Sequence, residues 1–97
     1  MVLEKKDFDS YLNEEFMVRL PDEEDLPLEL VEISEMNTKQ TICFSLLFRG
    51  AKERVLPQGN FTFEHGNMGQ RDLFLVPVMV AKADGIYYEV VFNRLRE

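Results

Sequence analysis

The chain contains a single histidine, His65, and it directly follows Glu64. A histidine and a carboxylate are the side chains that most often move protons in catalysis, so an enzyme built on this chain would use these two as an acid–base pair. The alternation of Asn60–His65 places His65 on the side of Phe61 and Phe63, close to a turn. A hydrogen-bonded structural histidine at the rim of an apolar face is the more common arrangement.

Other side chains that could act as nucleophiles or metal ligands lack the sequence context that this chemistry needs. Ser10, Ser34 and Ser45 have no Gly-x-Ser-x-Gly surroundings. Cys43 is the one cysteine, so it forms no internal disulfide, and no neighbouring motif would activate its thiol. No paired Cys and His residues stand at metal-binding spacing. We therefore expect no enzymatic activity, no catalytic residues, no metal and no cofactor.

Charge is distributed unevenly along the chain. Residues 1–35 hold twelve acidic and three basic side chains, a formal charge of −9, whereas residues 36–97 carry +2. The densest acidic stretch, Asp22–Asp25, lies between Pro21 and Pro27, which predicts a solvated loop. A recognition surface for a basic partner is the alternative. The stretch has neither the alternating oxygen ligands nor the glycine of a calcium loop.

A small basic cluster contrasts with this acidity. Arg49, Lys52 and Arg54 fall at and just after the end of an expected strand, where they could meet an acidic partner or form an ordinary solvated surface. The net charge of −7 argues against nucleic acid as a partner, because binding to phosphates needs a cationic surface.

Alternation of apolar and polar residues predicts a mainly β fold. The pattern is clearest over Gln40–Arg49, and it slips by one residue near Leu30–Val31, as in a β-bulge. A short helix is expected over Asp7–Leu12. The expected strands are 16–20, Leu28–Met36, Gln40–Arg49, Asn60–His65, Gln70–Val80 and Ile86–Asn93.

Short turns between consecutive strands favour one antiparallel meander of about six strands, curled or barrel-like, in a single domain over residues 1–97. With 45% hydrophobic residues the chain can fill one modest core. No apolar run approaches the ~20 residues that a membrane-spanning helix needs, and the start does not resemble a secretory signal. We therefore expect a cytoplasmic protein without a membrane partner.

One expected strand segment is apolar on both faces. Leu73–Val80 contains no polar side chain, so both of its faces should be covered, either by the N-terminal helix and flanking strands or by a partner. Pro77 cannot donate to a strand ladder and predicts an edge or bulge position. The interface candidates are Phe74, Val76, Pro77 and Val78. They favour a non-enzymatic interaction or assembly module that binds another protein or a second copy of itself.

A small-ligand carrier is the second hypothesis. Its pocket would lie inside the curled sheet, with an apolar lining and a polar mouth formed by Arg49 or His65. Six strands enclose little interior volume, so this hypothesis ranks below the first. The expected lining residues are Phe44, Phe48, Phe61 and Phe63.

Several stretches together resemble an uncharacterised family of small bacterial proteins, known only as a domain of unknown function. The stretches are 44–50 (FSLLFRG), 56–65 (LPQGNFTFEH), Met68-Gly69, 73–78 (LFLVPV), Asp84-Gly85, Tyr88-Glu89 and Phe92-Asn93. The resemblance implies no assigned activity and no catalytic residues. It implies a shared polar role for Glu64 and His65, for which a hydrogen-bonded turn anchor is the simpler explanation. It also implies an association with phage-tail-like systems through neighbouring genes.

Overall fold

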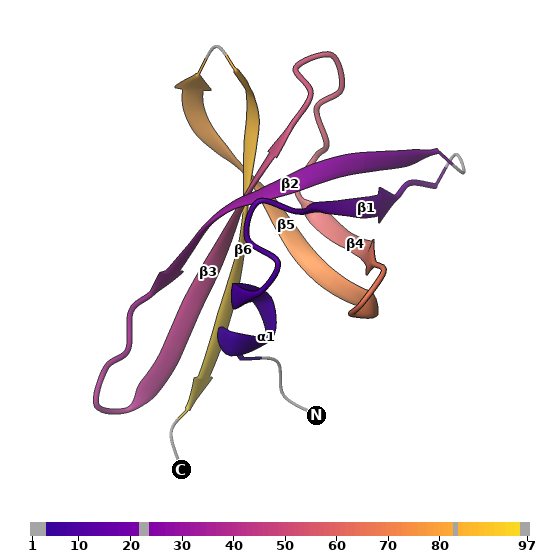
Figure 1. Cartoon of the computed structure of the whole chain (residues 1–97). Helices are drawn as coiled ribbons and strands as arrows, with labels where there is room; N and C mark the ends of the chain where they lie inside the picture. The colour runs from indigo at the N-terminus through magenta and orange to yellow at the C-terminus, as the bar shows by residue number, and fades with distance from the viewer. Residues whose placement is uncertain (1–3, 22–23, 83, 96–97) are drawn as a thin grey trace.

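The computed structural model describes residues 4–21, 24–82 and 84–95 and has the mainly β fold that the sequence predicts (Figure 1). A four-residue helix precedes six antiparallel strands, which close into one ring. The elements are α1 (Lys6–Asp9), β1 (Glu15–Arg19), β2 (Asp25–Glu35), β3 (Thr41–Gly50), β4 (Gly59–His65), β5 (Gly69–Lys82) and β6 (Gly85–Leu95).

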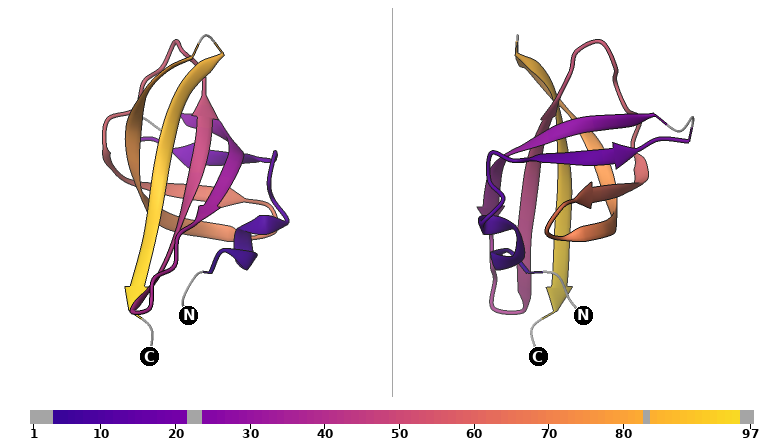
Figure 2. Two further views of the ribbon diagram at one scale, coloured as in Figure 1. Left: turned by 90° about the vertical axis from the view of Figure 1, so that its left-hand side faces the viewer. Right: turned by 45° about the vertical axis from the view of Figure 1, so that its right-hand side comes forward.

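The strand order departs from a simple meander at one place. Around the ring the order is β1-β2-β3-β6-β5-β4, so β3 lies beside β6 and not beside β4 (Figure 2). The β3–β6 pairing runs without interruption from Thr41↔Leu95 to Gly50↔Ile86, which makes it the longest contact of the barrel. The segment 51–58 leads from β3 to the opposite side of the ring, where β4 pairs with β1 and closes the barrel.

Local sequence explains two irregularities of β2. The β2–β3 register skips Val31 between Leu30 and Glu32, which confirms the predicted bulge. Pro27 lies within β2 opposite Met17 of β1, although the sequence suggested that it ends a loop. The strand tolerates it because β3 first pairs with β2 at Glu29, so the missing N–H has no ladder partner there.

The N-terminal helix is shorter than predicted. It ends at Asp9 rather than at Leu12, and the chain continues as turns. Phe8 is almost fully buried against Phe44 and Phe92, whereas Leu12 stays 42% exposed. Four residues cannot form a stable helix alone, so docking of Phe8 holds this turn in place.

The barrel interior is filled by apolar side chains from every strand and from α1. Backbones approach closely where β3 ends: a Cβ on Gly50 would lie 2.5 Å from Leu28 Cδ2, and one on Gly85 would lie 2.6 Å from the Gly50 carbonyl oxygen. Fully or almost fully buried residues include Phe16, Val18, Leu28, Leu30, Leu46, Phe48, Phe63, Leu75, Tyr88 and Val90.

The two faces of β5 are not equally covered. Leu73 and Leu75 point into the core, but Phe74 lies on the outer face and is 46% exposed. Of the two alternatives, coverage of both faces within the chain does not hold at Phe74, because α1 docks on β3 and β6 instead. Pro77 pairs with Tyr88 of β6, while the β4 pairing ends at Leu75, so the proline has a strand neighbour on one side only among the described residues.

Candidate functional site

Glu64 and His65 lie on opposite faces of β4, so their side chains point away from each other. Glu64 faces outward, where its carboxylate accepts hydrogen bonds from Arg19 (Nη2–Oε1 2.6 Å) and Gln70 (Nε2–Oε2 3.1 Å). His65 faces inward and is 8% exposed. The two side chains therefore do not form the acid–base pair that an enzyme would need, and Glu64 links β4 to β1.

His65 is held by two hydrogen bonds and two aromatic rings. The Asn67 backbone N–H donates to Nδ1 at 3.1 Å, so the proton is on Nε2, which donates to Glu14 Oε1 at 2.7 Å. The rings of Tyr11 and Phe16 lie 4.4 and 4.8 Å from the imidazole. This arrangement anchors the β4–β5 turn and the start of β1. Nothing in the sequence around Glu14 identified it as the partner of His65.

Arg49 joins three elements on the outside of the barrel. Its guanidinium donates to Glu29 of β2 and, at 3.2 Å, to Asp84 in the β5–β6 hairpin. The hydrogen bond to Glu29 is the main cause that raises the pKa of Arg49 above its usual value. The Tyr87 hydroxyl donates to the Asp84 carboxylate at 2.9 Å and, as the main cause, lowers the pKa of Asp84. All these groups are already paired within the chain.

The acidic and basic stretches seen in the sequence contact each other in part. Arg54 pairs with Glu24 at 2.7 Å, and Arg19 pairs with Asp25 at 2.9 Å. The rest of the acidic stretch, Asp22 and Glu23, lies outside the described residues. Because the described part of the acidic stretch is neutralised internally, it offers little free charge to a basic partner.

The four phenylalanines expected to line a ligand pocket differ in burial, and three of them pack inside the barrel. Phe44 stacks on Phe92 with ring centroids 4.5 Å apart, and Phe48 lies 5.2 Å from Phe63. Phe44, Phe48 and Phe63 are buried by one another and by the remaining core, whereas Phe61 is only partly buried. Their rings thus occupy the interior in which a ligand would have to fit.

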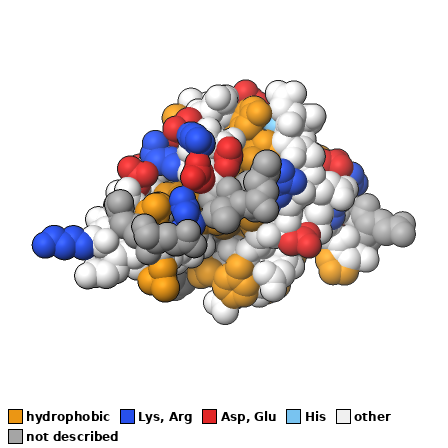
Figure 3. All heavy atoms as spheres, turned by 90° about the horizontal axis from the view of Figure 1, so that it is seen from below, with side chains coloured by type: hydrophobic (Ala, Val, Ile, Leu, Met, Phe, Trp, Pro, Cys, Tyr) orange, Lys and Arg blue, Asp and Glu red, His pale blue; other side chains and the backbone are white. Residues whose placement is uncertain are grey.

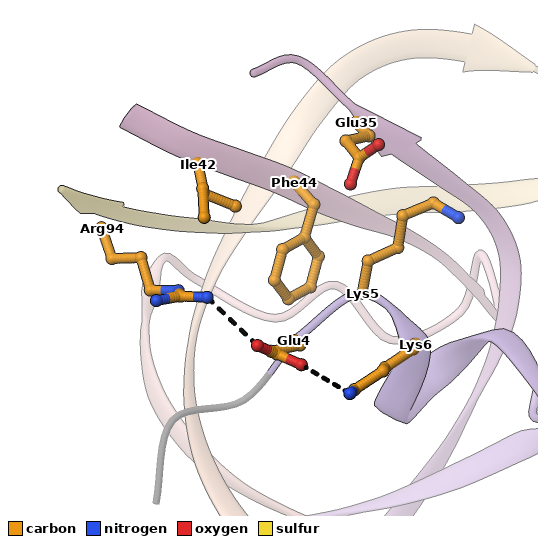
Figure 4. A pocket seen from close by; sticks show the side chains of 7 residues that line it. All are labelled: Glu4, Lys5, Lys6, Glu35, Ile42, Phe44 and Arg94. Carbon is orange, nitrogen blue, oxygen red and sulfur yellow. Dashed lines mark hydrogen bonds and ion pairs between the residues drawn. The ribbon is translucent and has the colours of Figure 1, made fainter. Parts of the chain in front are cut away.

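A surface hollow of about 210 Å³ lies between α1 and the ends of β2, β3 and β6 (Figure 4). Its floor is formed by Ile42 and Phe44, and charged side chains surround it. Glu4 accepts a hydrogen bond from Arg94 at 3.1 Å and pairs with Lys6 at 3.2 Å, so these cations are not available to an anionic ligand. We assign no ligand to this hollow.

The most distinctive surface lies where β5 and β6 separate, and we call it the fork. Their pairing reaches Val76↔Glu89, after which β5 turns away to follow β4 (Figure 1). Phe74 and Val91 are the next outward-facing residues on the two strands, and they are 46% and 50% exposed. On the face seen from below, hydrophobic side chains reach the surface between charged ones (Figure 3).

Of the predicted interface residues, Phe74 is thus the most exposed. Val76, Pro77 and Val78 are partly buried, and Val76 lies at the vertex of the fork. Val91 was not singled out from the sequence, although its apolar type on the outer face of an alternating strand was a readable signal. The fork brings it close to the end of the β5–β6 pairing.

Within the described ranges, no group of three His, Cys, Asp or Glu side chains is placed to hold a metal ion, and no helix reaches the length and apolarity needed to span a membrane.

No curated protein and no solved structure matches the chain. A family model matches residues 3–92, and the chain therefore belongs to the family described as Domain of unknown function (DUF6916).

Proposed function

We propose that this chain is a non-enzymatic protein-interaction or assembly module that binds its partner through the outer face of β5 around Phe74. The observation that carries the proposal is the 46% exposure of a phenylalanine in a regular strand, next to the apolar Val76. Complete burial of a fully exposed side chain of this kind contributes about 1.5–3 kcal/mol, and because Phe74 is 46% exposed in the chain, a partner would add about half of that. The polar groups that could have served catalysis are engaged in structural pairs, which supports a binding role.

The setting of this module is part of the proposal. The resemblance seen in the sequence supports a bacterial protein with phage-tail-like assemblies as its context, and the cytoplasmic location expected from the sequence remains part of the proposal. A small-ligand carrier ranks below this function, because the rings of Phe48 and Phe63 pack on each other inside the barrel.

Replacement of the exposed apolar residues tests the proposal. Phe74→Ser together with Val76→Ser should remove associated protein, because the variant face no longer gains free energy by leaving water. The measurement is native mass spectrometry of the chain purified gently from its own host, in wild-type and variant form. Val55→Ser is the control, since Val55 is 58% exposed but lies in the loop after β3.

The expected result is a discrete complex for the wild type and for Val55→Ser, and its loss in the double variant with the circular dichroism spectrum unchanged. A complex of the same mass in the folded double variant would contradict binding through β5. A complex that carries only small-molecule mass would favour the ligand carrier instead.

A further inference from the structure

The second half of β6 has a strand neighbour on one side only. β3 pairs with β6 as far as Leu95, but among the described residues β5 pairs with it only at Glu89, Tyr88, Tyr87 and Gly85. Figure 2 shows that β5 does not follow β6 along this half, so every second residue of 90–95 presents its backbone N–H and C=O groups to an edge without a strand partner among the described residues. Such an edge is a template for another strand.

This edge lacks most of the devices that normally prevent strand addition, and its one inward-facing charge, Arg94, is paired with Glu4 of the same chain. Natural edges are protected by lysines, prolines, bulges or inward-pointing charges. Residues 90–95 (VVFNRL) contain no proline and no lysine, and their pairing with β3 has no bulge. Arg94 is their one charge, and Glu4 binds it within the chain at 3.1 Å. The outward side chains Val91 and Leu95 are 50% and 74% exposed.

We propose that residues 90–95 of β6 pair in antiparallel fashion with the same segment of a second copy of this chain. This inference rests on the proposed function and names both the partner and the strand that it adds. A two-fold axis makes such a contact self-complementary, because each copy offers the same edge to the other.

The sequence of the edge selects one register. In this register Asn93 lies opposite Asn93 of the second copy. Val91 then faces Leu95 of the second copy, and Leu95 faces Val91 of the second copy, so both apolar residues are covered. A register centred on Phe92 would put Val91 opposite asparagine. One centred on Val91 would direct the second strand toward Tyr87, where β5 already pairs with β6.

The same arrangement accounts for Phe74. A strand beside β6 takes the place that β5 leaves beyond Val76, so it enters the fork between Val91 and Phe74. The net charge of −7 on each copy opposes association at long range, whereas the paired segments carry no acidic residue. Added salt screens this repulsion over about 10 Å at 0.1 M, so we expect it to strengthen the dimer.

Sedimentation equilibrium of the full chain, purified alone, tests the proposal. We expect a monomer–dimer equilibrium whose larger species has twice the monomer mass of 11.4 kDa and whose dissociation constant falls as salt is added. Val91→Lys with Leu95→Lys should raise that constant at least tenfold, because lysines block an edge. Val55→Lys is the control at an exposed apolar residue outside the sheet. A monomeric wild type, or a folded double lysine variant that dimerises like the wild type, would overturn the proposal.

A cross-link tests the register independently of stability. Cys43 lies opposite Asn93 within the chain and would capture a new thiol there, so it is first replaced by serine. In Cys43→Ser with Asn93→Cys, mild oxidation should give a disulfide-linked dimer, since opposed Cα atoms of antiparallel strands lie about 4.5–5.5 Å apart. Cys43→Ser with Lys52→Cys, in the exposed loop after β3, should remain monomeric. Equal cross-linking of both variants would exclude the proposed register.

The two proposals fail in distinguishable ways. If the purified chain stays monomeric while the host preparation yields a complex that depends on Phe74, the partner is another protein and only the second-copy proposal fails. If neither preparation associates, both proposals fail.

Discussion

Tyr87 and Asp84 show how one buried hydroxyl controls a charge at the barrel rim. Tyr87 is 5% exposed, and its hydroxyl donates to both carboxylate oxygens of Asp84, at 3.1 and 2.9 Å. The hydrogen bond favours the ionised form and lowers the pKa of Asp84 below its ordinary value of 3.8. Arg49 then bridges this carboxylate to Glu29 across β3.

Tyr87→Phe should raise the pKa of Asp84 toward 3.8, because the strongest donor to the carboxylate is lost. In the wild type the lowered folded-state pKa stabilises the protein fully above the unfolded pKa, and this contribution disappears as the pH falls through the folded-state value. The variant should therefore lose part of its pH-dependent stability, with the difference from wild type shrinking in acid. Carboxyl NMR titration of Asp84 measures the shift, and an unchanged pKa would contradict the assigned cause.

Two glycines let β3 and the β5–β6 hairpin approach each other. A side chain at Gly85 would meet the Gly50 carbonyl oxygen at 2.6 Å, and the φ of Gly85 is +153°, which residues with a Cβ rarely adopt. One at Gly50 would meet the fully buried Leu28 at 2.5 Å. The close contact between the end of β3 and the β5–β6 hairpin therefore requires glycine, which has no Cβ, at both positions.

Gly85→Ala should lower the free energy of unfolding by about 2 kcal/mol or more, because backbone strain and a backbone clash act together. Gly66→Ala is the matched control, since a Cβ there meets nothing within 4 Å, and it should change stability by less than about 0.5 kcal/mol. Urea unfolding measures both. If the two variants had the same free energy of unfolding, the hairpin would have shifted to accommodate the new Cβ without loss of stability, and the prediction would be wrong.

At the scale of the whole molecule, the N-terminal segment completes the core at one end of the barrel. Phe8 packs on Phe44 and Phe92 of β3 and β6, while Tyr11 packs on Phe16 of β1 and on His65 of β4. The segment therefore connects the β3–β6 side of the ring to its β1–β4 side. Side-chain burial, and not helix propensity, holds it there.

Phe8→Ala should lower the free energy of unfolding by about 3–5 kcal/mol, the usual cost of removing a buried phenylalanine. Leu12→Ala removes a 42% exposed side chain of the same segment and should cost much less. Thermal or urea unfolding of the pair provides the measurement. A small effect of Phe8→Ala would mean that the barrel is stable without this segment.

The sequence by itself determined the local features of the protein. Apolar alternation defines the strands because side chains of a strand point to opposite faces in turn, and the slip at Leu30–Val31 located the bulge of β2. The six strands, the short helix and the barrel-like curl follow from these local patterns. Phe74 was also named from the sequence as an interface candidate, because it belongs to a strand segment that is apolar on both faces.

Only the tertiary structure decided which strands meet and which polar residues pair. The β3–β6 and β1–β4 contacts join segments far apart in the chain, and no local pattern encodes them. The alternation of β4 already put Glu64 and His65 on opposite faces, but only the fold brought Glu14 to His65. The fork likewise arises because β5 follows β4 while β6 follows β3, and this leaves Val91 and Phe74 exposed at the same junction.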